Sequence, residues 1–261
     1  MARVRLDALL ASRGLFESRS RAAAAVLAGE VFVGAGRARI DKPGQQVAED
    51  VEISVATPPP YVSRGGVKLA NALDALGVPV EDRRALDVGA STGGFTDVLL
   101  QRGAAHVVAL DVAYGELHMK IRGNERVTVL ERVNARALAC EQLPYRPELV
   151  VADVSFISLT KVLPAVLACT AEAFDCLAMV KPQFEVGKGL VGKGGVVKDA
   201  TMREEAVLDV ARAAQGEGCV VAGVASSGLP GPSGNREVFL WLADSGRPAV
   251  GNLAAAVAEA V

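Results

Sequence analysis

Four charged side chains stand at the ends of short apolar segments that have the composition of buried strands. These terminal residues are Asp87, Asp111, Asp153 and Lys181. In an open α/β sheet the carboxyl ends of the parallel strands share one edge, and ligands bind at that edge. One charged strand terminus usually marks an exit to solvent, whereas four indicate a shared site. Asp111, about twenty residues beyond a glycine turn, is placed to hold the two ribose hydroxyls of an adenosine.

The glycine turn follows the first of these segments, in the stretch DVGASTGGFTD at 87–97. Glycines let the backbone approach a ligand without an intervening Cβ, and an apolar-periodic helix is expected from Phe95 onward. The spacing Gly89, Gly93, Gly94 differs from the G-x-G-x-x-G of a dinucleotide site. A turn of this kind also occurs for packing alone, so the stretch by itself leaves a ligand role and a packing role open.

The stretch at 87–97 resembles the S-adenosylmethionine motif of the TlyA family, also labelled the haemolysin A family, within the FtsJ-like methyltransferases. YVSRGGVKL (61–69), VVADVSFISL (150–159) and MVKPQFEVG (179–187) resemble the same family. The resemblance implies an α/β fold: a Rossmann-like methyltransferase sheet with a small N-terminal α+β RNA-binding domain. It also implies that S-adenosyl-L-methionine is the cofactor. The implied reaction is 2′-O-methylation of ribose, with cytidine as the expected nucleoside, in small- or large-subunit ribosomal RNA or in both.

The resemblance further implies a catalytic set of two lysines and two acids. Lys68, Asp153, Lys181 and Glu237 match, in order and residue type, the Lys-Asp-Lys-Glu tetrad of ribose 2′-O-methyltransferases. Lys181 is then the base or the hydroxyl-steering residue, Asp153 orients it, and Lys68 and Glu237 support them. Which member holds the proton stays open. By spacing alone, Lys68 reads as an ordinary surface lysine.

Two further residue sets are expected from the same resemblance and from local charge. The cofactor set is Asp87, Gly89, Ala90, Ser91, Gly93, Gly94, Phe95, Asp111, Asn134 and Asp153. The RNA-binding set is Arg3, Arg5, Arg19, Arg21, Arg64, Lys188 and Lys193. The last two lie in a segment with five glycines within 187–195, which we interpret as a clamp closing over RNA, although a surface loop is the simpler alternative.

Residues 1–57 form a separate unit, and its first 42 residues have an excess of basic residues. Two short helices are expected, the first with Leu6, Leu9 and Leu10 on one face and the second capped by Ser18 or Ser20. Over residues 1–42, eight Lys and Arg residues stand against four Asp and Glu residues. Basic side chains bind phosphates, although a charge run is usually a solvated face. SRSRAAAAVLAGEVFVGAGRARIDKPGQQV resembles the alpha-L RNA-binding domain, which favours RNA.

The proline-rich segment 58–63 is expected to be a stiff linker, and 64–261 is expected to be the methyltransferase domain. The chain has 261 residues, a net charge of −2 and 51% hydrophobic residues, which is not the composition of a generally basic nucleic-acid binder. Four cysteines without a C-x-x-C pair, together with two histidines, predict free thiols, no metal site and a cytoplasmic location. We also expect a monomer without a membrane partner.

Three alternatives remain at this stage. An NAD(P)-binding oxidoreductase would share the α/β fold, but the glycine spacing is unsuited to it. A membrane-active haemolysin-like protein would need an apolar span or a strongly amphipathic basic helix, and neither is evident. A non-catalytic RNA chaperone would have no need for aligned charged positions at one sheet edge.

Overall fold

The computed structural model describes residues 3–56, 59–187, 189, 191–192, 194–231 and 233–261. The chain divides into two compact units, Met1–Pro59 and Pro60–Val261. Each unit has its own hydrophobic core: one cluster in the first, and one on each face of a large sheet in the second. The two units are therefore described separately.

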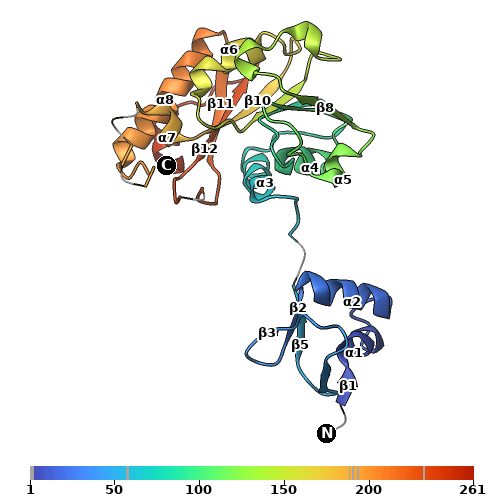
Figure 1. Ribbon diagram of the computed structural model, residues 1–261. Helices are drawn as coiled ribbons and strands as arrows, with labels where there is room; N and C mark the ends of the chain where they lie inside the picture. Colours follow the sequence, from blue (N-terminus) through green and yellow to red (C-terminus); the bar gives the residue numbers. More distant parts are fainter. Residues whose placement is uncertain (1–2, 57–58, 188, 190, 193, 232) are drawn as a thin grey trace. The chain divides into compact units, whose positions relative to one another are not determined.

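The first unit packs two helices against short strands (Figure 1). Leu6, Leu9 and Leu10 are buried, as their helical spacing predicts. The Ser18 hydroxyl caps the second helix by accepting from the Arg21 amide at 3.2 Å. The elements are β1 (Arg3–Arg5), α1 (Leu6–Ser12), α2 (Arg19–Ala28), β2 (Val31–Val33), β3 (Ala38–Arg39), β4 (Gln46–Ala48) and β5 (Ile53–Val55).

The second unit is built on a seven-stranded sheet with the order β11-β12-β10-β9-β6-β7-β8. The strands are β6 (Arg84–Val88), β7 (His106–Asp111), β8 (Val127–Glu131), β9 (Leu149–Ala152), β10 (Asp175–Val180), β11 (Val220–Ser226) and β12 (Val238–Ala243). Strands β6 to β10 are parallel, whereas β12 runs antiparallel to β10, with Val238 opposite Val180. The start of β12 therefore lies at the same edge as the carboxyl ends of the parallel strands.

Helices cover both faces of this sheet, as in other doubly wound α/β folds (Figure 1). Helices α3 (Arg64–Leu76), α4 (Gly94–Gln101) and α5 (Met119–Arg122) pack on one face, and α6 (Leu163–Leu167), α8 (Ala200–Gly216) and α9 (Leu253–Ala260) on the other. Short elements complete the unit: α7 (Pro182–Glu185), η1 (Ala135–Ala137), η2 (Cys140–Gln142) and η3 (Leu159–Lys161). No helix in the described ranges has the length and apolar character to cross a membrane.

The cysteines depart from the sequence expectation of four free thiols. Cys140 and Cys169 form a disulfide, although 29 positions separate them in sequence. The packing of α6 beside the segment that carries η1 brings the two side chains together. Cys176 and Cys219 are free and buried. Within the part of the chain that the structure describes, no three His, Cys, Asp or Glu side chains form a group that could hold a metal ion.

Candidate active site

Two cavities adjoin at the carboxyl edge of the sheet. The larger, which we call the reaction cavity, has a volume of about 670 Å³ and lies between the start of α3 and the ends of β9 and β10. The smaller, which we call the nucleoside cavity, has a volume of about 370 Å³ and lies over the ends of β7 and β9. Both are lined by Gly89, Ser91, Asp153, Ser155 and Phe156. Ligands in the two cavities would therefore meet at these residues.

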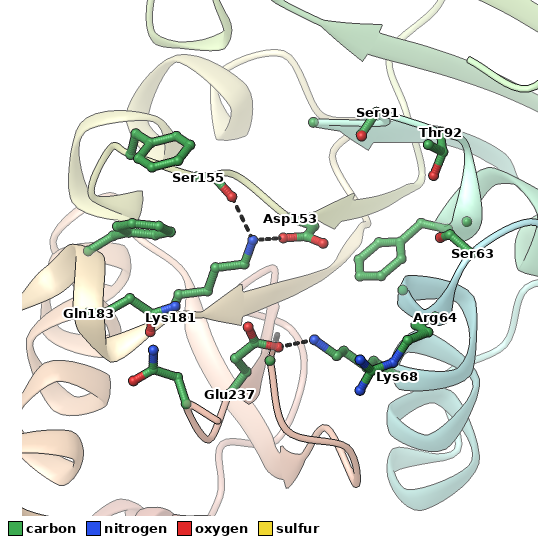
Figure 2. Close-up of a pocket in the computed structure, with 18 of the residues that line it drawn as sticks. Ser63, Arg64, Lys68, Ser91, Thr92, Asp153, Ser155, Lys181, Gln183 and Glu237 are labelled. Atoms are coloured by element: carbon green, nitrogen blue, oxygen red, sulfur yellow. Dashed lines mark hydrogen bonds and ion pairs between the residues drawn. The ribbon is translucent and has the colours of Figure 1, made fainter. Parts of the chain in front are cut away.

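The four predicted catalytic residues line the reaction cavity together (Figure 2). The Lys68 amine forms an ion pair with Glu237, and the Lys181 amine forms one with Asp153. Lys68 comes from α3, Asp153 and Lys181 directly follow β9 and β10, and Glu237 directly precedes β12. The antiparallel direction of β12 is what brings the glutamate to this edge.

The two ion pairs differ in depth. The side chains of Lys68 and Glu237 are 8% and 3% exposed, whereas those of Lys181 and Asp153 are 11% and 23% exposed. A deeply buried ion pair is held firmly, because removing one partner leaves an uncompensated charge that costs about 3–5 kcal/mol. The Lys68–Glu237 pair therefore forms the floor of the cavity, and the Lys181–Asp153 pair is the one more open to a ligand.

The glycine turn at 89–94 is shaped by close backbone contacts. The Gly89 amide donates to the Leu110 carbonyl at 2.8 Å, which ties the turn to β7. Gly89 has φ +85°, and a Cβ there would overlap the Asp153 carbonyl oxygen. Replacing this glycine would therefore displace the backbone of a predicted catalytic residue. Ala90, Ser91, Gly94 and Phe95 continue along the wall of the reaction cavity.

Asp87 lies beneath the turn rather than in it. Its side chain is fully buried in β6 and accepts from the Thr96 hydroxyl at 2.6 Å, while its other oxygen, Oδ1, has no partner. Burial raises the pKa of the Asp87 carboxyl to about 7. Neither Asp87 nor Gly93 is among the residues that line the two cavities. Their position in the structure fits shaping the turn better than contacting a ligand.

Asp111 lies at the end of β7 and lines the nucleoside cavity. Its two carboxylate oxygens accept from the amides of Ser91 and Ala113, at 2.7 and 2.8 Å. Asn134 lines the same cavity and caps η1 by accepting from the Arg136 amide at 3.0 Å. The walls between them are apolar, formed by Val112, Val133, Val154, Ile157 and Val162. A carboxylate beside an apolar slot suits a nucleoside, with its flat base and ribose hydroxyls.

The predicted RNA-binding residues are placed in three ways. Arg3, Arg5, Arg19 and Arg21 are exposed on the first unit, where Arg5 and Arg19 also face Asp7 at 2.6 and 3.5 Å. Arg64 is exposed at the start of α3, lines the reaction cavity and donates to the Pro230 carbonyl at 3.1 Å. Lys188 and Lys193 lie outside the described residues.

Several cavity residues were missed by sequence reasoning. Ser155 accepts from the Lys181 amine at 2.9 Å, and the neighbouring residue Phe156 is 91% exposed. Phe156 has φ +64°, which is unusual for an aromatic residue, and its ring centroid is 5.1 Å from that of Phe184. Ser155 and Phe156 fall within VVADVSFISL, two and three positions after Asp153. This closeness to a predicted catalytic residue was the signal that could have identified them as cavity residues.

The chain has clear relatives among known proteins. The family model of the FtsJ-like methyltransferases matches residues 61–244. A Mycobacterium tuberculosis protein named 16S/23S rRNA (cytidine-2′-O)-methyltransferase TlyA is 53% identical over 247 residues, covering 92% of this chain and 90% of that protein. Hemolysin A of Brachyspira hyodysenteriae is 40% identical, covering 77% and 84%. A solved structure described as a candidate hemolysin from Streptococcus thermophilus is 37% identical, with a TM-score of 0.74, covering 99% and 96%.

Proposed function

The chain belongs to the FtsJ-like methyltransferase family, and on this premise we propose that it methylates the ribose 2′-hydroxyl of cytidine in ribosomal RNA. The cofactor of this reaction is S-adenosyl-L-methionine. The observation that carries the proposal is the meeting of the two cavities at Asp153 and Ser155, within reach of the Lys181 amine. The family match supports this interpretation over the NAD(P)-dependent oxidoreductase and the membrane-active alternatives.

The nucleoside cavity suits the adenosine part of the cofactor. Asp111 would accept from the ribose hydroxyls, because each carboxylate oxygen can accept more than the one backbone hydrogen bond it already has. The apolar slot between Val133 and Ile157 would take the adenine, with Asn134 at its rim. When bound, S-adenosyl-L-methionine supplies a methyl group on a positively charged sulfur, already activated for transfer.

The reaction cavity would hold the target ribose. A ribose hydroxyl is a poor nucleophile at neutral pH, so the protein must align it and help to remove its proton. Lys181 belongs to the more exposed of the two ion pairs in the cavity and would steer the hydroxyl or accept its proton. Asp153 holds the Lys181 amine in place, and the Lys68–Glu237 pair braces the floor beneath it.

An exposed aromatic side chain at the cavity supports a nucleic-acid substrate. The ring of Phe156 is almost fully open to solvent and packs only partly against Phe184. Proteins that act on single-stranded RNA commonly stack unpaired bases on such rings, at about 1–3 kcal/mol per base. A cytidine turned out of its helix would bring its ribose to Lys181 while its base lies against this pair of rings.

The first unit would supply RNA affinity. We assign residues 1–57 to an alpha-L RNA-binding domain, 58–63 to a linker and 64–261 to the catalytic domain. The exposed arginines Arg3, Arg5, Arg19 and Arg21 would contact phosphates, which dominate nucleic-acid affinity. The M. tuberculosis relative is named for 16S and 23S rRNA, and on this basis the partner is ribosomal RNA or a ribosomal subunit. The protein would then act in the cytoplasm, as a monomer.

The proposed function is tested by product analysis. Purified protein is incubated with methyl-labelled S-adenosyl-L-methionine and ribosomal subunits that lack the modification, and the RNA is digested to nucleosides. We expect the label in 2′-O-methylcytidine. Label on a base, or no transfer to either subunit or to free ribosomal RNA, would contradict the proposal.

A further inference from the structure

The Lys181 amine has two partners at its end of the reaction cavity. It forms an ion pair with Asp153 and donates to the Ser155 hydroxyl at 2.9 Å (Figure 2). An amine nitrogen has three positions besides its bond to carbon, each occupied by a hydrogen or by the lone pair. In the described part of the chain no further hydrogen-bond acceptor of this nitrogen is found, and the contact with Asp153 is an ion pair rather than a hydrogen bond. One position therefore stays available for a ligand in the cavity.

From this geometry we propose that Ser155 is a positioning residue for Lys181. The Ser155 hydroxyl takes one of the three positions on the nitrogen through its hydrogen bond, and the Asp153 charge attracts the amine on a second side, so that the third position faces the target hydroxyl. With Asp153 alone, the amine would be free to rotate about the bond that carries it. The inference rests on the proposed function, because the third position on the nitrogen has a target only if a ribose hydroxyl binds in the cavity.

The place of Ser155 between the cavities agrees with this role. Ser155 lines both the reaction cavity and the nucleoside cavity. The donor methyl and the acceptor oxygen would have to meet at this boundary. Ser155 would therefore fix the direction of the Lys181 amine at the point where the two reacting groups meet. A misplacement of about 1 Å at such a point can slow a reaction roughly 10²-fold.

The turn that carries Ser155 is fixed at both ends. At one end the Asp153 amide donates to the Val88 carbonyl at 2.9 Å. At the other end the Glu185 carboxylate accepts from the Ser158 hydroxyl at 2.5 Å and from the Leu159 amide at 2.9 Å. Between these anchors lies Phe156 with its positive φ.

A bulky residue with positive φ costs free energy and persists where surrounding contacts impose it, which happens most often at functional sites. The strained turn therefore agrees with a positioning role for the serine beside it. Because Glu185 comes from α7, which directly follows Lys181, the same short segment fixes both the lysine and its serine partner.

Steady-state kinetics on the full chain test the proposal. Ser155→Ala should lower kcat by roughly 10- to 100-fold, with the KM for RNA and the Kd for S-adenosyl-L-methionine within about twofold of wild type, because only the direction of the amine is lost. Ser155→Thr keeps a hydroxyl acceptor and should restore most of the turnover. Ser245→Ala is the matched control, since Ser245 is exposed and lines neither cavity. An unchanged kcat in Ser155→Ala, or a loss confined to KM, would overturn the proposal.

A second measurement needs no turnover. An amine-reactive reagent, trinitrobenzenesulfonate, is applied to the wild type and to Ser155→Ala, and modification of each lysine is followed by peptide mass spectrometry. The rate at Lys181 should change by about threefold or more, while the rate at Lys42 in the first unit stays constant. An unchanged rate of modification at Lys181 would contradict the contact between Ser155 and Lys181. If the modification rate at Lys181 changes but the protein methylates no ribosomal RNA, the contact between Ser155 and Lys181 is supported and the proposed function is rejected.

Discussion

At the scale of single residues, we expect the reaction to depend most on Lys181. Lys181→Ala should retain both cofactor and RNA binding but lose turnover by about 10²–10⁴-fold, the range of general acid–base contributions. If Lys181 accepts the proton, Lys181→Arg should also lack turnover, because arginine stays protonated. Rates under saturating RNA and cofactor, with Lys161→Ala as a surface control, separate turnover from affinity.

The arginine variant distinguishes two roles for this amine. A fully active Lys181→Arg would leave the ribose target in place but reduce Lys181 to an electrostatic role. A Lys181→Ala variant with normal turnover would remove the lysine from the reaction altogether. Guanidinium geometry differs from that of an ammonium group, so a partial loss in Lys181→Arg is informative only together with the alanine result.

Asp87 gives a prediction about stability and pH. Its carboxyl has a pKa of about 7 in the folded protein, against about 3.9 in an unfolded chain. Between these values the folded state binds a proton that the unfolded state does not, so unfolding free energy falls as pH rises, by at most about 1.4 kcal/mol per unit. Asp87→Asn removes this dependence, and its free energy of unfolding should fall less steeply from pH 4 to pH 7.

Urea denaturation of the cofactor-free protein at several pH values measures this difference. Burial also raises the pKa of Glu185, but that residue is present in both proteins, so the difference between them isolates Asp87. Parallel curves for wild type and Asp87→Asn across this range would show that Asp87 is ionised in the folded state.

At the scale of elements, the strand positions follow closely from the sequence because buried parallel strands are short apolar runs that end in charged residues. β7 ends at Asp111, and β9 and β10 end directly before Asp153 and Lys181, as their apolar runs predict. The direction of β12 does not follow from its own pattern, since alternation is the same in either direction. For this reason the resemblance, rather than the strand pattern, placed Glu237 in the catalytic set.

Other features depend on contacts between distant segments and leave little trace in the sequence. The Cys140–Cys169 disulfide arises where α6 packs beside the segment that carries η1. The contact of Ser155 with Lys181 arises from the turn after β9. In both cases the residue types were visible but the pairing was not, because side-chain proximity is set by tertiary packing.

The end of β7 gives a prediction about cofactor affinity. Asp111→Ala removes the carboxylate that would accept from the ribose hydroxyls, and also the two backbone hydrogen bonds that fix the turn. Affinity for S-adenosyl-L-methionine should fall about 10- to 100-fold, since hydrogen bonds to charged groups contribute about 1.5–3 kcal/mol each. Calorimetry measures this affinity, and Asp74→Ala on α3 serves as the control variant. Unchanged affinity in a folded Asp111→Ala protein would remove Asp111 from the cofactor site.

At the scale of the whole molecule, the net charge of −2 includes a local excess of basic residues, eight against four acidic ones, over positions 1–42. In the described part of the chain, seven exposed arginines lie on the first unit of 59 residues and seven on the second unit of 202 residues, whereas the four predicted catalytic residues all lie in the second. If the first unit supplies RNA affinity, a chain of residues 58–261 should bind S-adenosyl-L-methionine but methylate ribosomal RNA poorly. Full methylation by the shortened chain would refute this division of labour.

The salt dependence of RNA binding tests the role of the first unit in the full chain. RNA binding by the intact protein should weaken as salt rises, because phosphate contacts release counterions. Replacing Arg3, Arg5, Arg19 and Arg21 with glutamine should reduce both affinity and its salt dependence while leaving cofactor binding unchanged. If the slope with salt stays the same, the phosphate contacts lie elsewhere.

The central claim is that this protein places a methyl group on ribose oxygens of ribosomal RNA, and mapping those marks tests it most directly. A 2′-O-methyl group makes the adjacent phosphodiester resist alkali because the attacking hydroxyl is capped. Ribosomal RNA from cells with the protein, without it, and with only Lys181→Ala is hydrolysed and sequenced. We predict an alkali-resistant position at cytidine that is present only with the wild-type protein. Identical alkali cleavage in all three samples, or a methyl group found on a base, would contradict the claim.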